Sequence, residues 1–76
     1  MKTIVTRLRK ERINKGWTQL YVAEEVGISK TAVHDIEKGK QLPSYKVLVK
    51  LENLFGLSHR ELLAPVNDEE PFSRSN

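Results

Sequence analysis

The sequence predicts a small all-α domain built from five helices. A chain of 76 residues builds one domain, and without cysteine it has no disulfide or thiolate metal site to stabilise it. Gly16, Gly27 and Gly56 are each followed two positions later by Thr or Ser. That order is typical of one helix ending and the next being capped. Apolar residues between these points recur at helical spacing, so we expect a compact domain over residues 1–65 and a disordered acidic tail over 66–76.

The first helix is expected over about residues 3–15. Val5 and Leu8 give it an inward side, and Gly16 ends it. Trp17 precedes the Thr18 cap, and an apolar residue at that position commonly packs back onto the helix that the cap opens.

The stretch 18–36 predicts two helices joined by a tight turn. Thr18 is a good N-cap, and Val22, Ala23 and Val26 form the inward side of the helix that follows. Gly27 stands where the chain needs a positive φ, which glycine adopts without a Cβ penalty. Ser29 can then cap a helix over about 29–38, whose inner side is formed by Val33 and Ile36. A turn this short cannot lay the helices antiparallel, so the spacing is that of a helix-turn-helix.

The register of these residues resembles the Cro/cI-type helix-turn-helix family, also called the XRE family. The matching positions are Thr18-Gln19, Val22-Ala23, Gly27-Ile28-Ser29, Val33, Glu37 and Gly39, within a resemblance that covers about residues 5–63. The resemblance implies a lambda-repressor-like fold and DNA binding. It also implies that Arg12 pairs with Glu37 as a structural clamp between helices, and that Gln19 contacts a DNA phosphate.

The outward side of the third helix is the predicted base-reading surface. In this docking mode the first turns of the helix enter the major groove. Lys30 can donate to guanine, Thr31 can hydrogen-bond or pack on a thymine methyl, and Asp35 can accept from cytosine. Ala32 offers only an apolar contact, and His34 completes the set. Each is alternatively an ordinary solvated helix residue.

Basic and polar residues flank that helix. The chain carries a net charge of +3, with eleven bases against five acids up to Lys50 and two bases against five acids after it. A basic body favours a polyanion as partner. Contacts to phosphates position a protein without reading sequence, and the alternative is a lysine-rich turn that serves solubility. The predicted phosphate contacts are Thr18, Gln19, Lys38, Lys40, Gln41 and Lys46.

Two further helices are expected over 45–55 and 59–63. Ser44 caps the first, and Ser58 with Glu61 forms a capping box for the second. Glu52 stands where the family has a small residue, so either it finds a basic partner or this helix is rotated. The resemblance implies a dimer contact through this helix and the loop before it, formed by Leu57, Arg60, Leu62 and Leu63. Core packing of the same leucines is an equal alternative.

Other classes of function find little support. His34 and His59 are far apart with no metal-ligand spacing, so we expect no metal, no cofactor and no enzymatic activity. No apolar run approaches the length of a membrane span, and the N-terminus lacks the apolar centre of a signal peptide. We expect a cytoplasmic protein of a prokaryote or phage.

The predicted function is a sequence-specific transcriptional regulator, a small homodimeric repressor that reads a palindromic operator on double-stranded DNA. Its activity would be set by abundance, competition or another protein, including a protein antagonist or a toxin. The alternative is a protein-interaction module or antitoxin-type partner that uses the same fold without specific DNA binding.

Overall fold

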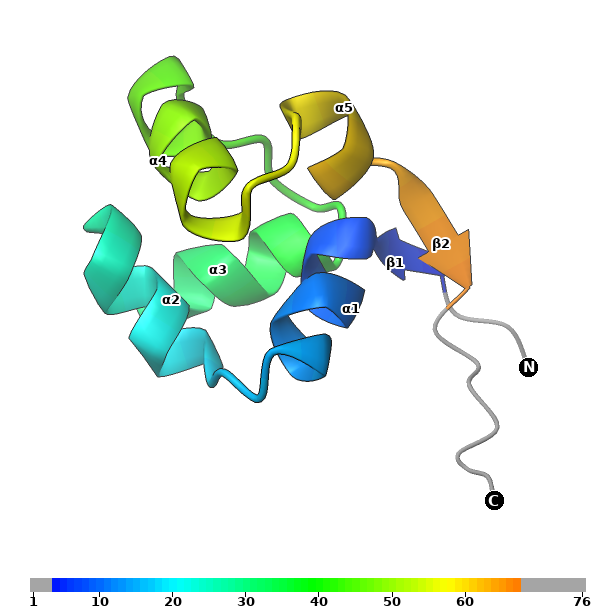
Figure 1. Cartoon of the computed structure of the whole chain (residues 1–76), viewed down its shortest axis with the longest axis horizontal. Coiled ribbons are helices and arrows are strands. Elements are labelled where there is room, and N and C mark those ends of the chain that lie inside the picture. The colour runs from blue at the N-terminus through cyan, green and yellow to red at the C-terminus, as the bar shows by residue number, and fades with distance from the viewer. Residues whose placement is uncertain (1–3, 68–76) are drawn as a thin grey trace.

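Figure 1 shows the computed structural model, which describes residues 4–67. Five helices are present, as the sequence predicts. They are α1 (Arg7–Asn14), α2 (Gln19–Val26), α3 (Lys30–Glu37), α4 (Tyr45–Phe55) and α5 (His59–Leu62). Two short strands, β1 (Ile4–Thr6) and β2 (Pro65–Asn67), pair at one side of the helices. No helix within residues 4–67 is long and apolar enough to cross a bilayer.

The strand β1 corrects the expectation of a helix beginning near residue 3. Val5 pairs with Val66 in an antiparallel register, and both Val5 and Thr6 are buried. The run Ile4-Val5-Thr6 is β-branched throughout, which favours an extended backbone. Thr6 stays extended as the N-cap residue, and α1 starts at Arg7. The inward spacing of Val5 and Leu8 suggested one helix, but the two side chains come from different elements.

The strand β2 also corrects the predicted tail. Disorder was expected from residue 66, but Val66 and Asn67 belong to β2 and pair with β1. The ordered domain therefore extends to Asn67 instead of ending at 65. The remainder of the predicted tail, 68–76, lies outside the described residues.

The core lies between the helices. Trp17 packs at its edge, with ring centroids 5.1 Å from Tyr21 and 5.3 Å from Phe55. The core contains side chains from all five helices: Leu8, Val22, Ala23, Val26, Val33, Ile36, Leu51, Phe55 and Leu62.

Hydroxyl caps and one glycine set the course of the chain through the helix-turn-helix. The Thr18 hydroxyl accepts from the Tyr21 N–H, and the Ser29 hydroxyl accepts from the Ala32 N–H, both at 3.0 Å. Gly27 has φ +75°, a left-handed conformation that a side chain would strain. These features end α2 and restart the chain as α3 within three residues, which fixes the two helices at an angle.

Glu52 finds its partner at the start of α5. Its Oε2 accepts from the His59 backbone N–H at 2.7 Å and lies 2.9 Å from His59 Nδ1. These hydrogen bonds hold the pKa of the Glu52 carboxyl below its ordinary value, with the contact to the His59 ring as the largest cause. The contact joins α4 to α5, and α4 keeps Leu51 and Phe55 in the core.

Candidate DNA-binding interface

One side of α3 is buried and the other faces solvent. Val33 and Ile36 are buried beneath it, so the helix is held by its inner side. On the outer side the predicted base-reading residues Lys30, Thr31 and His34 are exposed, whereas Ala32 and Asp35 are half-buried. The first turns of α3 therefore present donors, acceptors and a methyl group from a rigid support.

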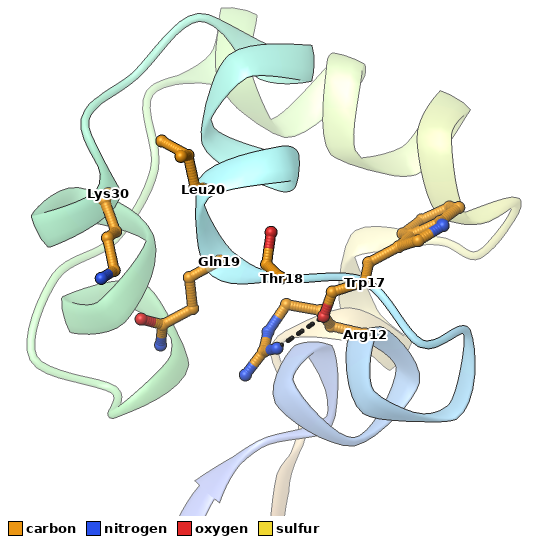
Figure 2. Close-up of a pocket in the computed structure, with 6 residues that line it drawn as sticks. All are labelled: Arg12, Trp17, Thr18, Gln19, Leu20 and Lys30. Atoms are coloured by element: carbon orange, nitrogen blue, oxygen red, sulfur yellow. Dashed lines mark hydrogen bonds between the residues drawn. The ribbon is translucent and has the colours of Figure 1, made fainter.

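Beside these turns lies a pocket at the N-terminus of α2 (Figure 2). The first turn of a helix leaves backbone N–H groups without an intrahelical acceptor and carries the positive end of the helix dipole. In Figure 2, Lys30 of α3 and Gln19 of α2 lie on the side of the pocket away from the Trp17 ring. The chemistry of this lining suits an anion. The pocket has a volume of about 490 Å³ and is lined by Arg12, Trp17, Thr18, Gln19, Leu20 and Lys30.

A buried ion pair lies behind the pocket. Arg12 donates to both carboxylate oxygens of Glu37, from Nε at 2.6 Å and from Nη2 at 3.2 Å. The Arg12 Nη1 also donates to the Trp17 carbonyl at 2.8 Å, the dashed line in Figure 2. The Glu37 side chain is 1% exposed and that of Arg12 is 12% exposed. The pair joins the end of α1 to the last residue of α3, in the place where a clamp was expected.

Gln19 belongs to the same network. Its Nε2 donates to Glu37 Oε1 at 3.1 Å, so the carboxylate receives hydrogen bonds from α1 and α2 together. From the family resemblance, Gln19 was expected to contact a DNA phosphate. No local spacing signals the contact with Glu37, because the two residues are 18 positions apart and meet only when α2 and α3 pack. The Gln19 amide therefore has a structural partner in Glu37, and the residue also lines the pocket.

The polar residues after α3 face solvent. A hydrogen bond holds this stretch against α3, because the Lys40 N–H donates to the Asp35 carbonyl at 2.8 Å. The expected phosphate-contacting side chains in this stretch, Lys38, Lys40, Gln41 and Lys46, are all exposed.

Comparison with known families decides the class of protein to which this arrangement belongs. Residues 8–62 match the model of the family HTH_3, described as helix-turn-helix. The chain belongs to this family. The Cro/cI-type assignment from the sequence is thus confirmed, and this helix-turn-helix protein is a DNA-binding transcriptional regulator of a non-enzymatic family.

Individual relatives belong to the same class of transcriptional regulators. The chain is 39% identical over 66 residues to an HTH-type transcriptional regulator of Sinorhizobium fredii, y4dJ, covering 87% of this chain and 80% of that protein. It is 40% identical over 57 residues to a prophage-derived HTH-type regulator of Bacillus subtilis, YonR, covering 75% of this chain and 53% of that protein.

Solved structures show the same fold. The restriction-modification controller protein C.AhdI from Aeromonas hydrophila superposes with a TM-score of 0.65 at 32% identity, covering 74% of this chain and 85% of that one. The N-terminal DNA-binding domain of SinR from Bacillus subtilis has the same TM-score at 29% identity, covering 84% and 91%.

The predicted dimer surface of the helix-turn-helix protein needs one correction. Leu62 is 0% exposed and belongs to the core, because α5 turns that side toward α1 and α4. Leu57 and Leu63 are half-buried against the core, and Arg60 is exposed. The candidate surface around α5 is thus reduced to Leu57, Arg60 and Leu63.

Within residues 4–67 of the helix-turn-helix protein, no group of three or more His, Asp or Glu side chains is placed to hold a metal ion. His59 contacts Glu52, whereas His34 lies on the outer side of α3.

Proposed function

We propose that this regulator is a repressor that binds a palindromic operator as a homodimer. The observation that carries the proposal is the exposed first half of α3, anchored by Val33 and Ile36, directly beside the anion-suited pocket at the start of α2. A helix presented this way can enter the major groove while the pocket receives a phosphate of the flanking strand.

The residues divide into two roles. Lys30 can donate to guanine O6 or N7, and Asp35 can accept from cytosine N4. Thr31 can hydrogen-bond to a base edge or pack its methyl on a thymine methyl. Ala32 and His34 complete the base-reading set. Thr18, Gln19, Lys38, Lys40, Gln41 and Lys46 serve as phosphate contacts that fix the register of the protein on the duplex.

A two-fold dimer explains how so small a reading surface becomes specific. Two copies related by a two-fold axis read two half-sites about 34–36 Å apart. Arg60 on α5, with Leu57 before the helix and Leu63 after it, forms the surface that we propose for this contact. The likeness to C.AhdI, a controller protein by its name, and to the SinR DNA-binding domain supports a regulatory role on DNA. Such a dimer acts in the cytoplasm, where it blocks transcription by occupying a promoter, and a protein antagonist can regulate it there.

The test is selection of bound duplexes from a random DNA library at near-physiological salt. We expect recovery of a palindrome with half-sites one helical turn apart, and loss of that preference in Lys30→Ala/Thr31→Ala. Sedimentation of the complex should show two chains on one duplex. No enrichment over the input library would overturn the proposal and favour a protein-interaction module.

A further inference from the structure

Two large apolar side chains stand out on the surface after α3. Leu42 and Tyr45 are each 81% exposed, more than any other large apolar residue within 4–67. They lie three positions apart, on either side of Pro43 and Ser44, the extended N-cap residue of α4. Exposed apolar side chains that gather in one place mark contact surfaces, whereas isolated ones are common and need no explanation.

The backbone that carries this pair is held at both ends. On the α3 side, the Gly39 N–H donates to the Ile36 carbonyl at 3.1 Å, and the Lys40 N–H donates to the Asp35 carbonyl at 2.8 Å. On the α4 side, the Ser44 hydroxyl accepts from the Val47 N–H at 3.3 Å. The two ends of the segment that carries the pair are thus held against α3 and α4.

The charges around the pair indicate its partner. Lys38, Lys40 and Lys46 are exposed, and residues 38–46 contain no acid. Within the described part of the chain, none of these three ammonium groups is ion-paired. In a two-fold contact between copies a patch meets itself, so three lysines would face three lysines. That repulsion disfavours a second copy as the occupant and favours a polyanion with an apolar interior.

We propose that Leu42 and Tyr45 contact the minor groove of DNA next to the major-groove segment read by α3. This inference rests on the proposed docking of α3. Proteins that insert apolar side chains between base steps of the minor groove partly unstack them and bend the duplex. Lys40 and Lys46 flank the pair and bind the phosphates on the two sides of the groove.

The contact adds a second source of specificity. An apolar side chain reads no hydrogen-bond pattern, but the energy of opening a base step depends on sequence. Pyrimidine–purine steps such as TA and CA are the most easily unstacked. The operator should therefore prefer such a step beside each α3 half-site, at a position that no polar side chain of α3 reaches.

The experiment measures DNA bending and affinity together, using the full chain and a duplex labelled at both ends for energy transfer. Leu42→Ala and Tyr45→Ala should each reduce the bend and weaken binding about tenfold. That loss in affinity is expected because a large apolar side chain is no longer buried in the contact. Ile13→Ala is the matched control, because Ile13 is a half-exposed apolar residue on α1, and it should change neither quantity.

A mismatched base pair at the contacted step separates this proposal from a general loss of affinity. A mismatch is already partly unstacked, so it should tighten binding by the wild-type protein and have no effect on Leu42→Ala. Unchanged bend and affinity in both variants would overturn the inference. A lower mass of the DNA-free variants than of the DNA-free wild-type protein would also overturn it, because the patch would then be covered by a second copy in the wild type.

The same measurements distinguish this inference from the proposed function. If library selection finds no preferred sequence, but the mismatch still tightens wild-type binding in a Leu42-dependent way, the minor-groove contact stands and the specific regulator does not. If a palindrome is selected and the mismatch has no effect, the reverse holds.

Discussion

Replacing Arg12 by Leu should remove a large share of the stability of this domain. Arg12 donates two hydrogen bonds to Glu37, whose side chain is 1% exposed. Without the guanidinium, the buried carboxylate keeps only the Gln19 amide, and breaking such a pair from one side costs about 3–5 kcal/mol. A chain of 76 residues has a total unfolding free energy of about 4–11 kcal/mol, at roughly 0.05–0.15 kcal/mol per residue. Arg12→Leu should therefore lose roughly a quarter or more of that stability.

Urea unfolding followed by fluorescence measures this directly, because Trp17 is the only tryptophan and packs at the edge of the core. Arg7→Leu is the matched control. Arg7 pairs with Glu11 at 3.1 Å on the surface of α1, with side chains 42% and 20% exposed. A surface pair at this spacing contributes about 0.3–0.5 kcal/mol, so the unfolding midpoint should barely move.

A double replacement tests whether the unpaired charge of Glu37, and not the lost volume of the Arg12 side chain, causes the loss of stability in Arg12→Leu. In Arg12→Leu/Glu37→Leu no buried charge is left alone, so the double variant should recover the roughly 3–5 kcal/mol that Arg12→Leu loses. If Arg12→Leu unfolds at the same urea concentration as Arg7→Leu, the reasoning fails, because the pair would then be no better than a solvated one.

Three other predictions concern the turn, the interface and the contact between α4 and α5. Gly27→Val forces a β-branched side chain to φ +75° and should lower the free energy of unfolding by about 1–2 kcal/mol in thermal melts; an unchanged melt would contradict the turn geometry. Lys30→Ala should relax base preference at one operator position, whereas Lys40→Ala should weaken all sequences alike and reduce the salt slope by about one; equal effects of both on every sequence would refute the division of roles. His59 lowers the pKa of Glu52 in the folded protein. The contact between them therefore stabilises the fold above pH 4.5, the ordinary pKa, and this stabilisation is lost as pH falls through the pKa of Glu52 in the folded protein. Urea midpoints measured through that acid range should fall less in Glu52→Gln than in the wild type, and parallel curves would show that the contact contributes nothing.

The helix-turn-helix could be predicted from sequence because its signals are local. The Thr18 and Ser29 caps and the glycine between them act within a few residues of the bonds they form. The same locality explains why the predicted bounds of α4 match the observed ones. The helix begins after the Ser44 cap and ends before Gly56.

Features that depend on distant packing were missed. The Ile4–Thr6 strand exists because a partner strand returns beside it from the far end of the described chain, and no neighbouring residue announces that partner. Surface and core were equal alternatives for Leu62, because a four-residue helix has too few positions to reveal which side turns inward. The contact between Gln19 and Glu37 likewise requires the packed angle of α2 and α3.

The pairing of β1 with β2 has a consequence for the order in which the protein is made. Residues 4–6 leave the ribosome long before their strand partner, which is among the last of the described residues to emerge. We expect the nascent chain to assemble α2 and α3 early, from contacts close in sequence, and to leave Val5 and Thr6 uncovered until β2 has left the ribosome. Chains stalled while β2 is still inside the ribosome should therefore be cleaved by protease within residues 4–6. Chains held on the ribosome by an added C-terminal linker, long enough to expose β2, should resist cleavage there.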